Sequence, residues 1–493
     1  MAADGSISVS RHPQQGDRSE VPAQNTQPVS LFRAIQFWFA LGWISFGSPL
    51  AQLALMQHEL VVKRRWISPG RFNHALNFCM ILPGPESQQL ATYIGWLMHG
   101  VKGALFAGIL VILPSLAITM LLAGLYVHYG HMVEIQALLY GLKPAVLAIV
   151  LAATVRLANR ALVGRVWIAI AVGAFLLLQL GGSFVFTLAL AGLIGWLMFL
   201  FTTQPALQGP SSRLQAALSR VLMAKPGISR LQSSFPLQAF GPSDDGYFVS
   251  DDTPPPSQGS YYSRNQIGIT VGIAVALFST FYGAILVYFP GILADMAGFF
   301  IKVSLLTFSG AYSVMPYLFD TMVTEKQWLT TGQLIDSIAL AEVTPGPLAI
   351  VNVFLGFIAA AQHTSLTAFP IIVAGSLGAL VVAVATFFPS FVFVMAGGPV
   401  IEATRKIPSW SLPLHAISAA VVAIMADLSL IFSRYILWPT PTGEWGSVGT
   451  LDLVAGLIAG LAIILMLQFR MGMIITMLIC ISLGVVASAL GLP

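Results

Sequence analysis

The stretch LNFCMILPGPESQQLATYIGWLMHG (residues 76–100) is apolar enough to lie in a membrane, yet Pro83-Gly84-Pro85 interrupts it at its centre. Proline has no amide hydrogen and clashes with the preceding helical turn, so this tripeptide ends one helix and starts another. Backbone groups that are freed at membrane depth must be buried in protein or line a cavity. The stretch therefore predicts a broken membrane helix, and breaks of this kind are candidate binding sites.

The composition of the whole chain agrees with a membrane protein. Of its 493 residues 57% are hydrophobic, and only 9% are charged, with 23 Lys or Arg and 19 Asp or Glu. Soluble proteins average about 25% charged residues, so a soluble enzyme is excluded. The basic residues are scattered in short loops, which argues against nucleic acid as a partner. We expect no enzyme activity, no metal and no cofactor. The chain has only two cysteines, which are far apart, and it has no nucleotide-binding or HExxH motif.

A spanning helix needs about 20 mostly apolar residues. Thirteen segments qualify, so the expected fold class is an all-α polytopic membrane protein. Between them, residues 203–266 are rich in Gln, Ser, Pro and charge, which predicts a disordered linker. The thirteen segments are 31–57, 71–98, 104–127, 136–158, 166–181, 183–202, 267–290, 294–319, 335–360, 367–396, 412–433, 449–468 and 471–491.

The two halves on either side of the linker resemble each other, which indicates an internal duplication. Leu113-Pro114-Ser115 of the first half is also echoed by Phe388-Pro389-Ser390 of the second. Under a shift of 262 residues the matching positions are Phe46 and Phe308, Val61 and Val323, Trp66 and Trp328, Gly70 and Gly332, and Pro83-Gly84-Pro85 and Pro345-Gly346-Pro347.

The number of segments predicts how the two copies are oriented. Six segments precede the linker and seven follow it, and the extra one lies before the second copy begins. The chain therefore crosses the membrane an odd number of times before the second copy begins, so the second copy enters from the opposite side. This is the inverted-repeat plan of many secondary transporters. The expected units are a polar N-terminus without a signal peptide (1–30), a first repeat (31–202), the linker (203–266), an extra helix (267–290) and a second repeat (291–493).

The basic residues predict the orientation in the cell membrane. Most Lys and Arg outside the apolar segments fall on the N-terminal side, which puts the N-terminus and the linker in the cytoplasm. One basic cluster falls on the other side and allows two interpretations. Either it attracts anions to an external funnel, or segments 31–57 and 71–98 re-enter instead of crossing, which we favour because each is broken near its centre. The cluster is Lys63, Arg64, Arg65 and Arg71.

A carboxylate accompanies each Pro-Gly-Pro break. Glu86 follows Pro85, and Glu342 precedes Pro345. An ionised carboxylate at membrane depth is costly and usually functional. Beside a bound anion the cost rises further unless the carboxyl group binds a proton, so both glutamates are proton-coupling candidates. The alternative is that each one caps a half-helix or pairs with a buried base.

The helices that start after the two breaks present unpaired amides, which suit an anion. Gln88 and Thr92 share one helical face there, although hydrogen bonding between helices is an equal alternative. Lys143 and Lys302 lie inside apolar segments and, with Lys63, Arg64 and Arg65, are candidates for anion attraction, with snorkelling as the alternative for the first two. The candidate binding residues are Phe46, Gly47, Ser48, Pro49, Asn77, Pro83, Gly84, Pro85, Gln88, Gln89, Phe308, Ser309, Gly310, Thr344, Pro345, Gly346, Pro347 and Asn352.

Two motif blocks bring a known family to mind. FGSPLAQLALMQHELVVKRRWIS (46–68), followed by residues 76–100, resembles the signature of the chromate ion transporter family. TFSGAYSVMPYLFD (307–320), with EVTPGP (342–347), is similar to the C-terminal domain of that family. The resemblance covers nearly the whole chain except the N-terminus and the linker. It departs where Gly-Gly usually follows Phe, because Gly47-Ser48 and Ser309-Gly310 stand there.

The resemblance implies a two-domain, multi-pass carrier of chromate, an oxyanion with the shape and charge of sulfate, and antiparallel halves. The expected function is a secondary transporter that moves chromate, and sulfate as a second substrate, by proton-coupled alternating access. The rivals are a gated oxyanion channel, a sulfate-type uptake carrier and a scaffold that recruits partners through its linker. The expected partners are the oxyanion and the lipid bilayer, with a homodimer left open.

Overall fold

The computed structural model describes residues 29–47, 49–80, 82–203, 247–250, 264–289, 291–308, 310–363, 366, 369–404, 411–439 and 451–491. These residues are almost entirely helical, and they form no β-strand beyond an isolated bridge between Ile67 and Val249. Four of the described helices are long and apolar enough to cross a membrane. The expected all-α fold of a polytopic membrane protein is therefore confirmed. The four are Glu86–Tyr129, Val133–Ala161, Ile371–Gly398 and His415–Leu437.

The first half begins with short helices, because the expected segments 31–57 and 71–98 are both broken. Ser30 caps the first helix and Ser68 caps the third, each hydroxyl accepting a hydrogen bond from a backbone amide three residues on. The elements are α1 (Leu31–Ile44), α2 (Pro49–Gln57), the π-helix η1 (His58–Lys63), α3 (Pro69–Cys79), α4 (Glu86–Tyr129), α5 (Val133–Ala161), α6 (Arg165–Gln179) and α7 (Phe184–Thr203).

The second half repeats this order after one additional helix. Thr330 and Gln333 form a capping box at the start of α13. The elements are α10 (Arg264–Tyr288), α11 (Ile292–Leu306), η3 (Ala311–Val314), α12 (Met315–Phe319), the π-helix η4 (Asp320–Glu325), α13 (Thr331–Val343), η5 (Leu348–Ile350), α14 (Val351–Gln362), α15 (Ile371–Thr404), α16 (Ser411–Leu437), α17 (Leu453–Leu467) and α18 (Met473–Ala489).

Helix α4 is two helices that reverse direction at His99 and Gly100, whose backbone angles are not helical. Gly95 and Gly103 approach each other so closely across this reversal that a side chain on either one would clash with the other's backbone. In the second half, Gly356 and Gly378 make the same kind of close approach between α14 and α15. Each half therefore contains a tight helical hairpin after its Pro-Gly-Pro break.

Unusual backbone features recur at a nearly constant offset between the two halves. The π-helices η1 and η4 begin at His58 and Asp320, which are 262 residues apart. Arg65 and Gln327 both adopt a positive φ, of 53° and 51°. The glycines of the two Pro-Gly-Pro turns, Gly84 and Gly346, do the same, with φ of 123° and 103°. The two halves thus share local geometry as well as sequence.

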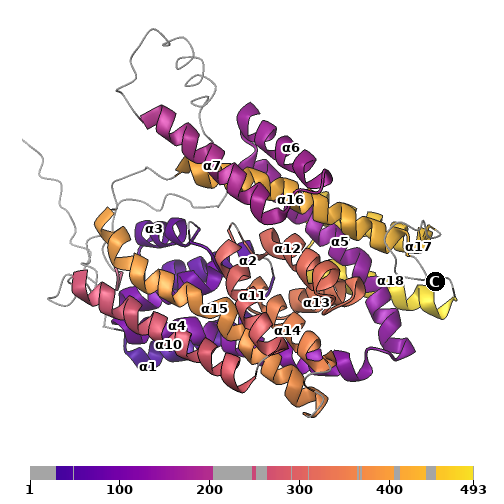
Figure 1. Cartoon of the computed structure of the whole chain (residues 1–493), viewed down its shortest axis with the longest axis horizontal. Helices are drawn as coiled ribbons and strands as arrows, with labels where there is room; N and C mark the ends of the chain where they lie inside the picture. Colours follow the sequence, from indigo (N-terminus) through magenta and orange to yellow (C-terminus); the bar gives the residue numbers. More distant parts are fainter. Residues whose placement is uncertain are drawn as a thin grey trace, which may run out of the picture.

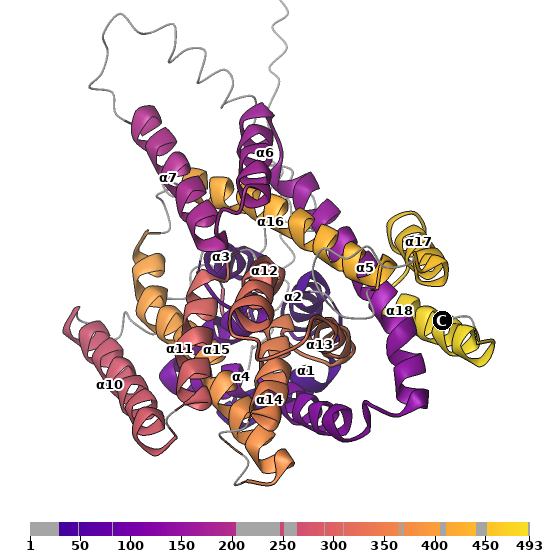
Figure 2. The ribbon, with the colours of Figure 1, turned by 45° about the vertical axis from the view of Figure 1, so that its right-hand side comes forward.

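The helices fall into two groups (Figures 1 and 2). The core group comprises α1–α4 and α11–α15, in which α1 packs on α4, α11 and α14 pack on α15, and α15 packs on α4, while α10 packs on the outside of α15. The flanking group comprises α5–α7 and α16–α18, in which α5 packs on α17 and α18, and α16 packs on α6 and α7. Each group therefore mixes helices of both halves. The groups meet where α13 packs on α5 and α12 packs on α16.

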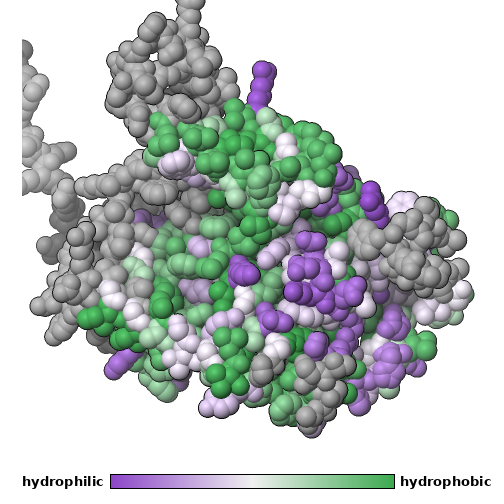
Figure 3. Space-filling view, in the orientation of Figure 1, coloured by the Kyte–Doolittle hydropathy of each residue, from purple (hydrophilic) through white to green (hydrophobic). Residues whose placement is uncertain are grey.

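Most of the face drawn in Figure 3 is hydrophobic, as expected for a surface that contacts lipid. Hydrophilic side chains gather over α12 and α13, close to the place where the two groups meet. Buried aromatic side chains such as Trp38, Trp96 and Phe354 fill the core group.

Four described residues of the expected linker are bound to the first half. Phe248 and Val249 donate backbone hydrogen bonds to the carbonyl oxygens of Arg65 and Trp66, and Ser68 donates one to Val249 at 2.9 Å. The Val249 side chain is buried. The expectation of disorder therefore does not hold for residues 247–250, and Thr203 and residues 264–266 belong to helices, whereas residues 204–246 and 251–263 lie outside the described residues.

Candidate functional site

The two breaks meet at a narrow hollow in the core group. It has a volume of about 240 Å³, most of which is crevice between atoms, and it has room for about one water molecule. Both halves contribute to its wall, and one proline of each Pro-Gly-Pro turn lines it. The lining residues are Pro49, Pro85, Glu86, Ser87, Gly310, Ala311, Pro347, Leu348 and Ala349.

Each Pro-Gly-Pro turn is held by the opposite half of the chain. The amide of Gly84 donates a hydrogen bond to the carbonyl oxygen of Thr307 at 2.8 Å, and the amide of Gly346 donates one to Ser45 at 2.7 Å. Ser45 and Thr307 are themselves 262 residues apart and follow α1 and α11. The break of one half is therefore pinned to the bend of the other.

Buried side chains support both turns. Gln89 donates from Nε2 to the carbonyl oxygen of Pro83 at 2.7 Å and to Oγ of Ser390 at 3.3 Å. Gln52 donates from Nε2 to the carbonyl oxygens of Gly346 at 2.5 Å and Gly47 at 3.0 Å. These amide side chains satisfy carbonyl groups that the broken helices leave without partners.

Two helix starts border the hollow. Pro85 is the N-cap of α4, and Pro347 is the N-cap of η5, which continues directly into α14. Neither cap has a side-chain hydrogen bond to the helix it starts. The first amides of a helix have no acceptor within that helix and carry partial positive charge. Because Ser87 and Ala349 line the hollow, both helix starts bring such charge to one place.

The two predicted carboxylates lie beside these helix starts. Glu86 is half-buried and lines the hollow. Glu342 is buried at the end of α13 and accepts a hydrogen bond from the hydroxyl group of Tyr312, a residue of η3. Glu86 therefore lies at the hollow itself, whereas Glu342 lies at the end of the helix before the second turn and does not line the hollow.

Two arginines on one face of α5 interact with these carboxylates. Arg160 interacts electrostatically with Glu86, and Arg156 interacts with Glu342. Their i, i+4 spacing places them on the same side of the helix. Because α5 belongs to the flanking group, this attraction acts between the two groups of helices.

Most other predicted binding residues do not line the hollow, and several form hydrogen bonds with other residues. Gln88 and Thr92 hydrogen-bond to each other at 3.4 Å, as their spacing predicts. Thr344 bonds to the carbonyl oxygen of Ala341, and Asn352 bonds to Thr386. Pro345 is buried, Phe308 is half-buried, and Phe46 and Asn77 are exposed. Ser48 and Ser309 lie outside the described residues.

The basic cluster lies at the docked linker segment and not at the hollow. Lys63 and Arg64 contact the carboxylate of Glu59 at 2.8 Å and 3.4 Å. Arg64 also lies over the ring of Phe37, and Arg65 lies 5.5 Å from the ring of Tyr247. The hydrogen bond from Lys63 lowers the pKa of Glu59 below its usual value. The fourth member, Arg71, is buried.

The two lysines inside apolar segments have different surroundings. Lys143 forms an ion pair with Asp336 of α13 at 3.9 Å. Lys302 is exposed on α11. Neither residue lines the hollow between the breaks.

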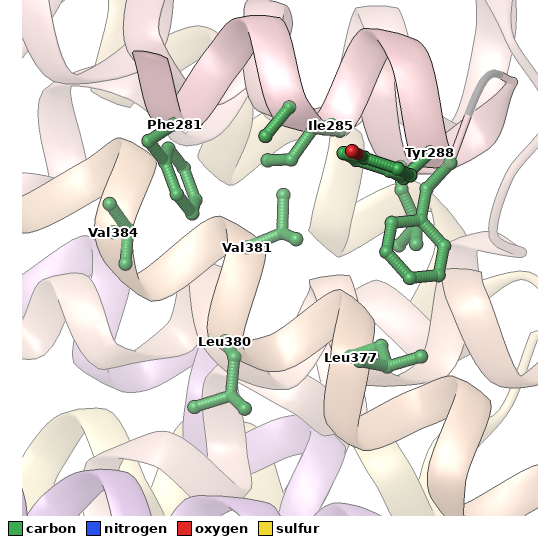
Figure 4. A pocket seen from close by; sticks show the side chains of 10 residues that line it. Phe281, Ile285, Tyr288, Leu377, Leu380, Val381 and Val384 are labelled. Atoms are coloured by element: carbon green, nitrogen blue, oxygen red, sulfur yellow. The ribbon is translucent and has the colours of Figure 1, made fainter. Parts of the chain in front are cut away.

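A second and larger pocket lies between α10 and α15 (Figure 4). Its wall consists of apolar side chains, among them Phe281, Ile285, Leu380 and Val384, and Tyr288 is its one hydroxyl-bearing residue. Apart from that one hydroxyl group, such a wall offers no donors for an oxyanion, and it suits a hydrocarbon chain. The hollow between the breaks is therefore the candidate anion site.

Several residues of the site were not predicted from the sequence. Arg160 follows the expected segment 136–158, but α5 continues through Ala161 and includes it. Gln52 and Tyr312 act through partners on other elements, so the residues next to them in the sequence do not reveal these roles. Ser115 and Ser390 belong to the repeated Pro-Ser motifs, and this repetition could have identified them.

Comparisons with known proteins agree with these features. The family model described as "Chromate transporter" matches residues 32–196 and 294–485, which together make up more than half of the chain. The "Chromate transport protein" of Cupriavidus metallidurans is 24% identical over 434 residues, covering 87% of this chain and 90% of that protein. The "Probable chromate transport protein" of Synechococcus elongatus is 24% identical over 413 residues, covering 84% and 87%.

A third relative, the "Chromate transport protein" of Pseudomonas aeruginosa, is 25% identical over 412 residues, covering 83% of this chain and 82% of that protein. No solved structure matches the chain. The family match falls on the two halves and leaves out the linker and α10. The chain, a helical membrane protein, therefore belongs to the chromate transporter family.

Proposed function

We propose that the chain is a secondary transporter that moves chromate across the cell membrane by alternating access, with the anion bound between the two Pro-Gly-Pro breaks. The observation that carries this proposal is the hollow to which both halves contribute a helix start, at Ser87 and at Ala349. Two helix N-termini that converge on one point suit a divalent tetrahedral oxyanion. Sulfate has the same shape and charge, so it is the expected second substrate or competitor.

The charges around the hollow support binding of an anion together with a proton. Arg160 interacts electrostatically with Glu86, and Arg156 with Glu342, so an ionised carboxylate offsets part of the positive charge of each arginine. Protonation of a glutamate frees its arginine for the oxyanion, and bound oxyanion in turn favours the protonated carboxyl. Anion and proton would therefore bind together, which is the basis of coupled transport.

The narrowness of the hollow supports a conformational cycle. Chromate is larger than the single water molecule that fits, so the walls must separate for it to enter. The two walls belong to different halves of the chain and are pinned by the equivalent bonds Gly84–Thr307 and Gly346–Ser45. A pair of equivalent contacts provides two equivalent ways of opening, one towards each side of the membrane.

The docked linker segment supports the re-entrant topology. Trp66 and Ser68 hydrogen-bond to Val249, and His99, at the reversal of α4, bonds to the carbonyl oxygen of Val29. The start of α1, the end of η1 and the reversal of α4 therefore share one face with the linker. We infer that α1–α3 and residues 86–98 dip into the membrane and return, and that this shared face is cytoplasmic.

The test is flux of radiolabelled chromate in sealed vesicles of known orientation, with and without a pH gradient and excess sulfate. We expect saturable flux, counterflow and acceleration by the gradient. Glu86→Gln and Glu342→Gln should each remove most of the acceleration, because an amide cannot exchange the proton. Glu134→Gln, an exposed glutamate at the start of α5, is the matched control.

Two outcomes would overturn the proposal. If both glutamine variants keep the acceleration of the wild type, proton coupling at these residues is wrong. If flux does not saturate and single-molecule currents appear, the chain is an anion channel, which is the rival that shares the same repeats.

A further inference from the structure

A buried carboxylate outside the anion site lies where the two helix groups meet. Asp336, on α13, has a side chain that is only 5% exposed. Its Oδ2 accepts a hydrogen bond from the hydroxyl group of Tyr126 at 2.9 Å. Its Oδ1 lies 3.9 Å from Nζ of Lys143, beyond hydrogen-bonding distance, and has no hydrogen-bond partner among the described residues.

Three other helices bring titratable groups to this carboxylate of α13. Tyr126 comes from α4, Lys143 from α5 and Tyr435 from α16, the last interacting with Asp336 electrostatically. The Tyr435 hydroxyl group also packs against Gly332, one turn before Asp336 on α13. The site therefore joins α13 and α4 of the core group to α5 and α16 of the flanking group.

The geometry is unfavourable for a permanent ion pair. Burying a carboxylate and an ammonium group is compensated only when the contact is close and the remaining lone pairs are satisfied. Here the contact is long, and one buried oxygen is left without a donor. Lys143 is 24% exposed, so its ammonium group keeps access to water if the contact is released.

A proton is the ligand that suits the unpaired Oδ1 of Asp336. A metal ion needs several anionic or carbonyl ligands, and the described residues contain no group of three or more His, Cys, Asp or Glu side chains that could hold one. Lys143 would also repel a cation. A proton on Oδ1 instead gives the unpaired oxygen a hydrogen and removes the buried charge.

We propose that Asp336 is a proton-binding site distinct from Glu86 and Glu342, and that its charge decides whether Lys143 holds α13 to α5. Ionised Asp336 attracts Lys143 and keeps the two groups of helices together. Protonated Asp336 loses this attraction, and α13 is free to move along α5. The far end of α13 leads into the turn at Pro347, which lines the hollow, so this movement would change the width of the anion site.

This inference rests on the proposed transport function for its consequence, but the proton site itself can be tested without substrate. The infrared absorption of protonated carboxyl groups is followed in the purified full chain as pH is changed. We expect Asp336→Asn to remove one titrating band, because the amide keeps an acceptor for Tyr126 but binds no proton. Asp295→Asn, at an exposed aspartate in the first turn of α11, should leave the band of Asp336 unchanged.

A second variant separates a proton site from a loss of folding. Lys143→Gln leaves Asp336 intact but removes its positive neighbour, so the same band should titrate at a pH higher by about one unit or more. The double variant Asp336→Asn with Lys143→Gln should again lack the band. Unchanged titration in Asp336→Asn, or no shift in Lys143→Gln, would overturn the proposal, whatever the flux assay shows.

The consequence for transport is measured in vesicles with the same variants. Asp336→Asn should bind chromate within about twofold of the wild type, because the residue is outside the hollow, yet its flux should depend less steeply on pH. If the infrared bands behave as expected but no variant alters flux, Asp336 binds a proton without coupling. If chromate is not carried at all, the proposed function fails and the proton site stands alone.

Discussion

The backbone amide of Gly84, in the Pro-Gly-Pro turn of the first half, donates a hydrogen bond to the carbonyl oxygen of Thr307 in the second half at 2.8 Å. The equivalent bond joins Gly346 to Ser45 at 2.7 Å. The two breaks are thus not independent kinks, because each is completed by the bend of the other half. Binding at the breaks and movement of the halves are therefore expected to depend on each other.

These glycines should tolerate no side chain. Both have a strongly positive φ, so alanine would be strained by about 1–3 kcal/mol at either position. A Cβ on Gly84 would also collide with Oγ of Ser390, and one on Gly346 with Oγ of Ser115. Gly84→Ala and Gly346→Ala should each lower the thermal unfolding temperature in detergent and abolish chromate flux.

Partial rescue distinguishes the clash from the backbone strain. Ser390→Ala removes the colliding oxygen and leaves its Cβ 3.5 Å from the new methyl group, where the remaining close atom is Nε2 of Gln89 at 2.8 Å, the movable end of a side chain. The Cβ of Ser115, which is fixed to the backbone, remains 2.8 Å from a methyl group on Gly346. Ser390→Ala should therefore restore part of the stability of Gly84→Ala, and Ser115→Ala should restore less in Gly346→Ala. Equal rescue in both pairs would contradict this geometry.

The sequence predicts the breaks but not how they are completed. Pro83-Gly84-Pro85 must interrupt a helix because proline lacks an amide hydrogen, and the carboxylate beside it is costly at membrane depth. By contrast, Gln52 and Ser390 reach the turns from the opposite half, and only the packing of α4 on α15 brings Ser390 to Gly84. Local sequence patterns carry no information about such contacts.

The sequence also does not predict with which groups the two arginines of α5 interact. Arg156 and Arg160 lie at the end of an apolar segment, where basic residues ordinarily mark the membrane surface. Only the position of α5 beside the core group brings them within electrostatic reach of Glu342 and Glu86. The π-helices η1 and η4 were also missed, because no local signal separates a π-helical turn from an α-helical one.

Removal of either arginine should weaken chromate binding. We expect Arg156→Gln and Arg160→Gln to raise the KM for chromate at least tenfold, which corresponds to about 1.4 kcal/mol, because a charge-assisted contact to a divalent anion is lost. Initial rates over a range of chromate concentrations measure this. Arg165→Gln, at an exposed arginine in the first turn of α6, is the matched control and should keep the wild-type KM.

The re-entrant topology predicts on which side the basic cluster lies. Lys63 is 60% exposed, and the two native cysteines are buried, so a cysteine introduced at position 63 can be labelled selectively. A membrane-impermeant thiol reagent should label Lys63→Cys from the same side of the membrane as Ser233→Cys in the linker. Labelling from opposite sides would show instead that segment 31–57 crosses the membrane.

The docked linker segment should protect the loop before α3 from hydrogen exchange. The amide of Ser68 donates to Val249, whose side chain is buried. Val249→Asp places a charge in this apolar position and should speed exchange at Ser68 at least tenfold. The amide of Gln333, which is capped by Thr330 in the second half, is an internal reference that should not change. Equal rates at Ser68 in both proteins would mean that the segment is not docked.

The location of bound anion is the most direct test of the central claim. A structure of the full chain with chromate, determined at the absorption edge of chromium, reveals the metal atom by its anomalous scattering. We predict one strong peak between the helix starts at Ser87 and Ala349, with the hollow wider than it is here and an arginine of α5 nearby. A peak at the basic cluster around Lys63, with the hollow unchanged, would contradict the claim.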